Sequence, residues 1–403
     1  MAGPPRPRVR DEMREVRIIS DGAMLVRSGL IERVGTRAEV EPLITAEHTV
    51  VDARGKAILP GFVDAHTHPV FGGNRVDEFE KRATGVSYEQ IASEGGGIRS
   101  TVRKTRAASE DELLSTATAR AHRFLRHGTT TIEAKSGYGL SLETELKMLR
   151  VMRRLQQSEP LKLVPTFLGA HEIPDEFRSD PQAYMDLIVN EMLPAVAAQR
   201  LADYCDVFCE PKIFSVASAR QVLEKARTLG LGLRMHADQL SRSGASELAG
   251  ELRTQTADHL EQIDERGIDA LVRGGVQPVV LPASVYTLGS KKFAPAREMI
   301  SRGLPLVLAT DFNPGSSPTQ SIPLVLSLAS TQMGLSCAEA LTAVTINAAY
   351  SLSIGDLIGS LEPGKIADFV LLDCEDYREI AYYVGTESVS SVYAKGKLVY
   401  QRN

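Results

Sequence analysis

The stretch GFVDAHTH, residues 61–68, carries the pattern that decides the fold. An apolar run leads into His66 and His68, and strand geometry points side chains two positions apart to the same side. Seven similar segments follow: TTTIEAK (129–135), LKLVPTFLG (161–169), DYCDVFCE (203–210), LGLRMHA (231–237), TADHLE (256–261), VQPVVLPA (276–283) and LPLVLATD (304–311). Helical patterns separate them, so the sequence predicts an α/β fold with a parallel (β/α)8 TIM-like barrel.

Two of the intervening helices carry start signals. Ser109 with Glu112 forms a capping-box pattern, and Gly128 supplies the stop for the apolar stripe that follows. Ser336 begins a second such pattern, which predicts a helix running through Ala348, beyond the last barrel strand.

Both ends of the chain differ from the middle. They contain short β-rich segments divided by Gly, Asp and Ser turn signals, at residues 16–35, 48–59, 359–374 and 390–401. We therefore expect a small β-sandwich domain formed by both ends (1–59 and 356–403) around a catalytic barrel (60–355). The basic, Pro-rich start, residues 1–10, is expected to be a loose tail.

Composition narrows the class of protein. Of 403 residues, 43% are hydrophobic and 24% charged, and no apolar run reaches the roughly 20 residues that a membrane helix needs. The net charge of −5 favours neither nucleic acid nor an anionic membrane surface, so a small-molecule substrate is expected. Four cysteines without CxxC spacing fit a reducing cytoplasm.

Five metal-binding side chains fall at or near the ends of predicted strands. They are His66, His68, His236, His259 and Asp311. A single buried histidine is more often a hydrogen-bonded core residue than a ligand, but barrel enzymes gather their active sites at the carboxyl ends of the strands. Imidazole and carboxylate groups suit zinc first and iron(II) second. A divalent ion supplies hydroxide at neutral pH, so the predicted chemistry is hydrolysis.

These residues belong to motifs that resemble a known family. PGFVDAHTH, the later single histidines and the aspartate after the eighth strand are similar to the amidohydrolase superfamily. The ordered strings HTHPVFGGNR, GGGI, AKSGYGL, LGAHEIP, HADQL, DHLE and LATDFNPGS resemble its imidazolonepropionase family. The resemblance implies a homodimeric enzyme of histidine degradation, which hydrolyses 4-imidazolone-5-propanoate to N-formimidoyl-L-glutamate.

The resemblance also assigns roles to residues. It implies one divalent metal ion held by His66, His68, His236 and Asp311. Proton transfer falls to Asp311 and His259, and which of them is the principal base stays open. Substrate contacts carried over by motif are Arg75, Tyr138, His171, Gln239, Asn313, Gly315 and Ser316. The guanidinium of Arg75 suits the propanoate carboxylate, whereas the Asn-Pro-Gly-Ser loop could equally be a plain turn.

Two positions weigh against rival functions. Gln239 stands where deaminases of the superfamily place a glutamate, and an amide cannot act as a general acid or base. Glu210 closes the fourth segment, where binuclear relatives carry a lysine, so one metal ion is expected. The alternatives are another cyclic-amide hydrolase, a nucleobase deaminase or a non-catalytic barrel scaffold.

Overall fold

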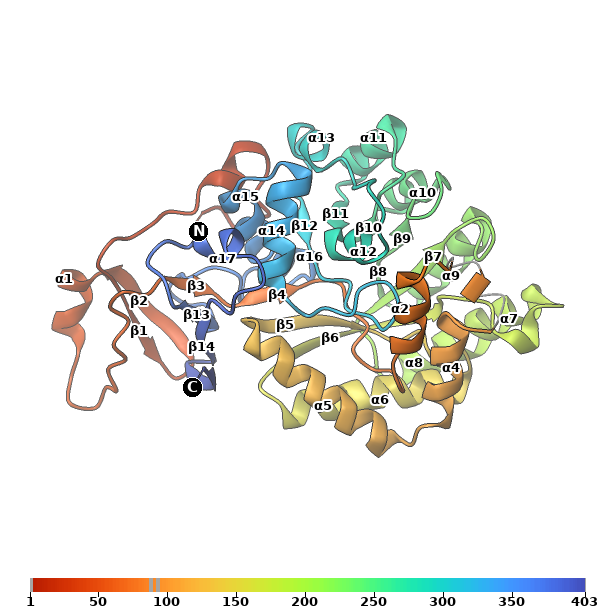
Figure 1. Cartoon of the computed structure of the whole chain (residues 1–403), viewed down its shortest axis with the longest axis horizontal. Coiled ribbons are helices and arrows are strands. Elements are labelled where there is room, and N and C mark those ends of the chain that lie inside the picture. Colours follow the sequence, from red (N-terminus) through yellow and green to blue (C-terminus); the bar gives the residue numbers. More distant parts are fainter. Residues whose placement is uncertain (1–2, 87–89, 92–94, 403) are drawn as a thin grey trace.

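The computed structural model describes residues 3–86, 90–91 and 95–402. Its main body is a parallel sheet in the order β4-β5-β6-β7-β9-β10-β11-β12, curled into a nearly closed barrel, with β8 also paired to β7 (Figure 1). The strands are β4 (Phe62–Asp64), β5 (Thr129–Lys135), β6 (Lys162–Ala170), β7 (Tyr204–Cys209), β8 (Gly232–Leu233), β9 (His236–Ala237), β10 (Thr256–His259), β11 (Gln277–Val280) and β12 (Val307–Leu308). The predicted α/β barrel is confirmed.

All eight predicted segments contribute a strand, with one difference. The fifth is divided into β8 and β9 because Arg234 and Met235 leave regular strand geometry. The segment stays attached to β7, since the Arg234 amide donates to the Cys205 carbonyl at 2.9 Å. His236 therefore still lies at the carboxyl end of the fifth barrel position.

The barrel closes where its first and last strands meet. Thr67 and Phe312 form an isolated parallel bridge, and the His68 amide donates to the Phe312 carbonyl at 2.8 Å. The buried carboxylate of Asp64 accepts hydrogen bonds from the Thr310 amide at 2.9 Å and the Thr310 hydroxyl at 2.5 Å. These contacts form the seam between the first and last strands, and they hold the segment that leads into His68 against the segment around Phe312.

Helices cover the outside of the barrel and connect its strands (Figure 1). They are α2 (Val76–Ala83), α4 (Ile98–Ala107), α5 (Glu110–Arg126), α6 (Leu142–Ser158), α7 (Pro181–Leu187), α8 (Leu193–Ala198), α9 (Val216–Thr228), α10 (Ala245–Leu252), α11 (Glu265–Gly274), α12 (Pro282–Thr287), α13 (Ala296–Ser301), α14 (Ile322–Met333), α15 (Cys337–Ala343) and α16 (Ile346–Ser351). Among the described residues, no helix is both long and apolar enough to span a membrane.

Both predicted capping boxes are present. Ser109 caps α5 and accepts a hydrogen bond from the Glu112 amide, and Ser336 caps α15 in the same way. The predicted single helix through Ala348 is wrong, because α15 ends at Ala343 and the chain resumes as α16. Thr345 interrupts it with the non-helical angles φ −127° and ψ −97°.

The two chain ends meet in antiparallel sheets on one flank of the barrel (left in Figure 1). One sheet has the order β15-β14-β13-β3, and the other is the β1-β2 hairpin. Their strands are β1 (Gly22–Arg27), β2 (Leu30–Thr36), β3 (Ile58–Pro60), β13 (Phe369–Leu372), β14 (Val389–Ala394) and β15 (Lys397–Gln401); the short helices α1 (Arg37–Val40) and α17 (Glu379–Tyr382) accompany them. One apolar cluster joins Ile31 of the hairpin to Phe369 and Tyr393, as expected for a shared domain.

The described start of the chain is docked from Arg8 onward, contrary to the expectation of a loose tail over residues 1–10. Arg8 is buried, its amide donates to the Asn347 side chain at 2.7 Å, and that side chain donates back to the Arg8 carbonyl at 2.9 Å. Met13, in the 3-10 helix Arg10–Arg14, is fully buried. Paired hydrogen bonds to α16 therefore order a segment whose composition alone indicated a tail.

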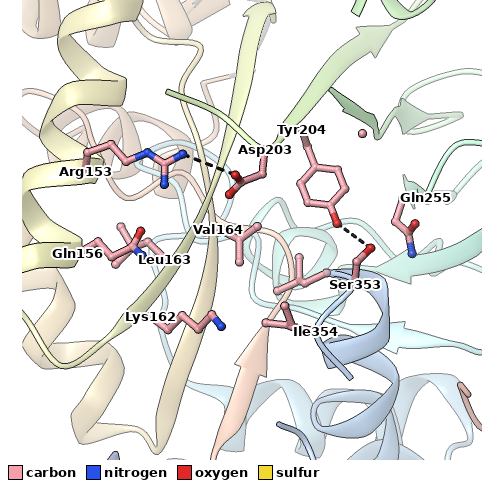
Figure 2. A pocket seen from close by; sticks show the side chains of 12 residues that line it. Arg153, Gln156, Lys162, Leu163, Val164, Asp203, Tyr204, Gln255, Ser353 and Ile354 are labelled. Atoms are coloured by element: carbon pink, nitrogen blue, oxygen red, sulfur yellow. Dashed lines mark hydrogen bonds and ion pairs between the residues drawn. The ribbon is translucent and has the colours of Figure 1, made fainter. Parts of the chain in front are cut away.

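A cavity of about 390 Å³ lies at the amino-terminal ends of β6, β7 and β8, away from the strand ends where catalytic groups are expected. Several of its polar side chains already have partners. Figure 2 shows Arg153 directed at Asp203, 3.5 Å away, and the Tyr204 hydroxyl donating to Ser353 at 2.9 Å. We therefore place the functional site at the opposite end of the barrel.

Candidate active site

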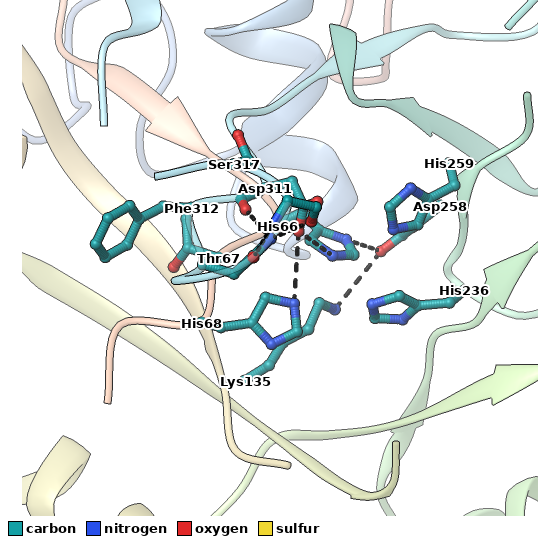
Figure 3. A network of polar contacts seen from close by, with 12 residues as sticks. His66, Thr67, His68, Lys135, His236, Asp258, His259, Asp311, Phe312 and Ser317 are labelled. Carbon is teal, nitrogen blue, oxygen red and sulfur yellow. Dashed lines mark hydrogen bonds and ion pairs between the residues drawn. The ribbon is translucent and has the colours of Figure 1, made fainter. Parts of the chain in front are cut away.

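Three of the predicted metal ligands converge at the barrel mouth. His66 and His68 follow β4, Asp311 follows β12, and one potential ligand atom from each lies within 4.8 Å of the others. Nε2 of His66 is 3.5 Å, and Nε2 of His68 is 3.6 Å, from Oδ1 of Asp311 (Figure 3). All three side chains are buried. The seam between the first and last strands brings them together.

His236 and His259 approach the same point from the other side of the barrel. With His66 they form a second group whose potential ligand atoms lie within 4.8 Å of one another. The ring centroids of His66 and His236 are 4.5 Å apart, and those of His236 and His259 are 5.1 Å apart. No single group at this distance contains all four predicted ligands. His66 groups with His68 and Asp311 on one side, and with His236 and His259 on the other.

The chemistry of these groups fits a transition metal. Nε2 of His66 and Nδ1 of His68 are buried without a hydrogen-bond partner among the described residues. Burial, reinforced by neighbouring cationic groups, holds the pKa of both imidazoles well below its usual range, which favours the neutral, metal-binding form. Nε2 of His66 and Nε2 of His68, which both face the Asp311 carboxylate, form with it a donor set suited to zinc or iron.

Two buried aspartates lie against the Nδ1 atoms of His66 and His236. Nδ1 of His66 donates to Oδ2 of Asp258 at 2.6 Å, which leaves Nε2 of His66 free to face a metal ion (Figure 3). Nδ1 of His236 lies 3.0 Å from Oδ2 of Asp206. A carboxylate on the far nitrogen fixes the tautomer and direction of a ligating histidine. Sequence reasoning missed both aspartates.

A buried lysine links these two aspartates. Nζ of Lys135 lies 2.6 Å from Asp206, 2.7 Å from Glu133 and 3.5 Å from Asp258. Burial alone would lower the pKa of Lys135, but the surrounding carboxylates outweigh it and raise it, so the ammonium stays charged. Arg234 completes the cluster, with Nε 3.3 Å from Glu133. The sequence offered one signal for this charged cluster, because Glu133 and Lys135 stand two positions apart within a predicted barrel strand. The structure shows that strand to be wholly buried.

His259 and Asp311, the predicted proton-transfer residues, both have unusual backbones. Their φ angles are +78° and +54°, which non-glycine residues adopt at a cost that functional sites often carry. Burial lowers the pKa of His259, but nearby carboxylates, Glu261 foremost at 3.6 Å, outweigh it and raise it. Burial also raises the pKa of Asp311. Both side chains are buried at the barrel mouth, so their affinity for a proton depends on the charges around them.

Arg75 lies immediately before α2, in the loop after the first strand. Its Nε donates to the Thr101 hydroxyl at 2.8 Å. A Cβ placed on Gly315 would lie only 2.3 Å from Nη1 of Arg75, so the guanidinium occupies space that any other residue at Gly315 would fill. Two predicted substrate contacts, one in the loop after the first barrel strand and one in the loop after the last, are therefore neighbours.

Tyr138 and His171 stand beside the predicted ligand His68. The His171 ring stacks on the His68 ring with centroids 5.3 Å apart, and the Tyr138 ring lies 5.4 Å from that of His171. Nδ1 of His171 donates to the Gly137 carbonyl at 3.0 Å, which leaves Nε2 as an acceptor. His171 keeps some exposure, but burial of its ring and the nearby His236 lower its pKa to about 3.

The loop after Asp311 is a compact turn built on Asn313. The side-chain oxygen Oδ1 of Asn313 accepts hydrogen bonds from the backbone amides of Gly315 and Ser316 at 2.8 and 2.7 Å, and the side-chain nitrogen Nδ2 donates to the Asp311 backbone carbonyl at 2.7 Å. The Ser316 hydroxyl lies 3.4 Å from the Asp311 carboxylate. Asn313 therefore shapes the turn, which places Ser316 beside Asp311.

The remaining predicted contact, Gln239, is half-buried in the loop after β9. Glu210, at the end of β7, supports this loop: its carboxylate accepts the Leu240 amide at 2.8 Å and the Ser241 hydroxyl at 2.7 Å. Glu210 therefore holds the loop that follows β9. The sequence did not indicate which segment it would hold.

The chain is similar to known proteins along almost its whole length. An imidazolonepropionase of Solibacter usitatus is 57% identical over 403 residues, covering 100% of this chain and 96% of that protein. An imidazolonepropionase of Symbiobacterium thermophilum is 46% identical, covering 99% of this chain and 94% of its own length.

Among solved structures, an adenosine deaminase from Xanthomonas campestris with bound zinc matches at a TM-score of 0.70 and 20% identity, covering 94% of this chain and 88% of that one. A 5-methylcytosine deaminase from Klebsiella pneumoniae gives 0.71 and 18%, covering 94% and 95%. At such identities these structures establish the fold alone. The model of the amidohydrolase family matches residues 57–399, and the chain belongs to this family.

Proposed function

We propose that this protein is an imidazolonepropionase, which hydrolyses the cyclic amide of 4-imidazolone-5-propanoate to N-formimidoyl-L-glutamate in histidine degradation. The observation that carries the proposal is the 57% identity to an imidazolonepropionase along the whole chain. In the reaction, water adds to the ring carbonyl carbon and the ring C–N bond breaks. The carbonyl becomes the new carboxylate, and the nitrogen stays in the formimidoyl group.

One divalent metal ion is proposed, held by His66, His68, His236 and Asp311. Zinc is the first choice and iron the second, because neutral imidazoles with one carboxylate suit both. When bound, such an ion supplies hydroxide at neutral pH and polarises the amide carbonyl. The buried, unpartnered Nε2 of His66 and the hydrogen bond from Nδ1 of the same ring to Asp258 support this assignment.

Proton transfer is assigned to Asp311 and His259. Asp311 can accept the proton of the attacking water, because its carboxylate lies among the imidazoles at the barrel mouth. His259 can orient that water or donate a hydrogen bond to the oxygen that gains negative charge. The ring nitrogen needs a proton as it leaves, and either group could return the one taken from water.

Substrate recognition is assigned to Arg75, Tyr138, His171, Gln239, Asn313, Gly315 and Ser316. Arg75 would grip the propanoate carboxylate, since a guanidinium can form two parallel hydrogen bonds to it. Its proximity to Gly315 and its electrostatic influence on His171 support a place in the site. Asn313 would act through the turn that carries Gly315 and Ser316.

The wider setting is also proposed. A cytoplasmic homodimer is expected, since two-fold dimers are the commonest assembly and no cysteine forms a disulfide in the described residues. The division into 1–59, 60–355 and 356–403 is supported by the pairing of β3 with β13.

The proposal is tested by activity. Protein loaded with zinc or iron is mixed with freshly prepared 4-imidazolone-5-propanoate, and the decay of ultraviolet absorbance is followed against a no-enzyme control. We expect accelerated decay with formation of N-formimidoyl-L-glutamate. An unchanged decay rate with either metal would refute the proposal, and ammonia release from guanine, adenine or cytosine would indicate a deaminase instead.

A further inference from the structure

The loop between β5 and α6, residues 136–140, is held by a carboxylate that does not face the metal site. Glu145, in the first turn of α6, is fully buried. Its carboxylate accepts hydrogen bonds from the amides of Gly137 at 3.1 Å, Gly139 at 2.7 Å and Leu140 at 2.9 Å. Because several amides share one charged acceptor, the loop has little freedom to change shape.

The shape that Glu145 holds is not one the loop would adopt by itself. Leu140 has φ +51°, in the left-handed region that residues with a side chain adopt only at a cost, whereas Gly137 adopts φ +98° without strain. Such strain persists only where the surroundings impose it. The carbonyls of the same loop are held as well: Arg106 of α4 donates to Gly139 at 2.7 Å and to Leu140 at 2.9 Å.

This loop carries one proposed substrate contact and directs another. Tyr138 lies between two of the bound amides, and its ring is buried against His68 and His171. The Gly137 carbonyl accepts the Nδ1 proton of His171 and so turns Nε2 outward as an acceptor. A Cβ on Gly137 would lie 2.8 Å from the Leu168 carbonyl, so the loop also packs tightly against β6.

We infer that Glu145 is a positioning residue for substrate recognition, which sets the places of Tyr138 and His171 by fixing the backbone between them. The inference rests on the proposed function, because it takes both residues to contact the substrate. Glu145 itself does not touch the substrate. Its effect is on binding of the substrate rather than on metal content or on the reacting bond.

The test is a double-mutant cycle between Glu145→Gln and Tyr138→Phe in the metal-loaded enzyme. The amide of Gln would present donors to a loop that offers donors, so Glu145→Gln should raise KM about tenfold or more. It should change kcat less and leave metal content unchanged. In the Tyr138→Phe background the same substitution should raise KM by a smaller factor, because part of its effect passes through Tyr138.

Glu339→Gln is the matched control. Glu339 is also buried and also accepts backbone and side-chain hydrogen bonds, but it caps α15, outside the proposed site. It should lower thermal stability without changing KM. Glu145→Asp serves if Glu145→Gln does not fold; its shorter side chain should raise KM by a smaller factor.

The outcomes separate the proposed function from the positioning role of Glu145. If the wild-type protein does not consume 4-imidazolone-5-propanoate, the proposed function fails. If it does, and Tyr138→Phe raises KM while the Glu145 variants do not, the positioning role is wrong. Equal factors in both backgrounds, or failure of both Glu145 variants to fold, would assign Glu145 to structure alone and overturn the inference.

Discussion

Replacing Asp258 with asparagine tests how far the metal site depends on residues that do not bind the metal. Oδ2 of Asp258 accepts the Nδ1 proton of His66 at 2.6 Å, and both side chains are wholly buried. Asparagine keeps the shape but removes the charge. It also leaves Nζ of Lys135, 3.5 Å away, with fewer anionic neighbours.

The size of the effect follows from this geometry. Mutation of a group that orients a metal-ligating histidine typically costs about 10- to 100-fold in metal affinity, or about 1.4 to 2.8 kcal/mol. The short distance and complete burial mean that solvent screens little of the interaction. We therefore expect Asp258→Asn to lie in the upper part of that range.

The assay is competition with a chelator of known affinity, followed by the fraction of protein that retains zinc. Asp269→Asn is the control, because Asp269 pairs with Arg302 on the half-exposed outer face of α11. The control should bind zinc as the wild type does. A folded Asp258→Asn protein with wild-type zinc affinity would refute the reasoning, since it would show that the carboxylate does not orient His66 for the metal.

Further predictions concern substrate binding, metal removal, thiol accessibility and helix capping. Arg75→Ala should lower kcat/KM about 10- to 100-fold through loss of hydrogen bonds to a carboxylate, with partial recovery in Arg75→Lys; unaltered kinetics would contradict the propanoate assignment. Chelation should abolish activity and lower Tm, and zinc or iron should restore both, whereas an unshifted Tm would argue against a bound metal. Cys205 and Cys209 should resist iodoacetamide at mildly alkaline pH until the protein unfolds, because burial raises the pKa of both thiols, that of Cys209 to about 12; mass spectrometry of native and denatured samples checks this. Ser109→Ala should destabilise the fold by about 1 kcal/mol through loss of the α5 cap and leave KM unchanged, as measured by denaturant unfolding and steady-state kinetics.

The barrel and the strand-end positions of the candidate site residues were predictable because their signals are local. Alternation within GFVDAHTH sends His66 and His68 to one side, and parallel strands bring their carboxyl ends to one edge. Helix starts follow from capping chemistry, as at Ser109. The break at Thr345 and the docking of Arg8 onto Asn347 were not predictable, because both depend on partners that only the folded chain brings near.

The supporting charges escaped prediction for a related reason. Glu145 looks like an ordinary surface residue when the sequence is considered alone. Lys135 stands in a predicted barrel strand, but the sequence does not show the partners without which a lysine is seldom buried. Lys135 takes its role from Asp206 and Asp258, which come from two other strands, and Glu145 takes its role from amides that any sequence possesses. A sequence pattern can therefore locate candidates for the reacting groups, because such candidates gather at strand ends. The groups that hold them in place emerge only when the contacts of each buried charge are known.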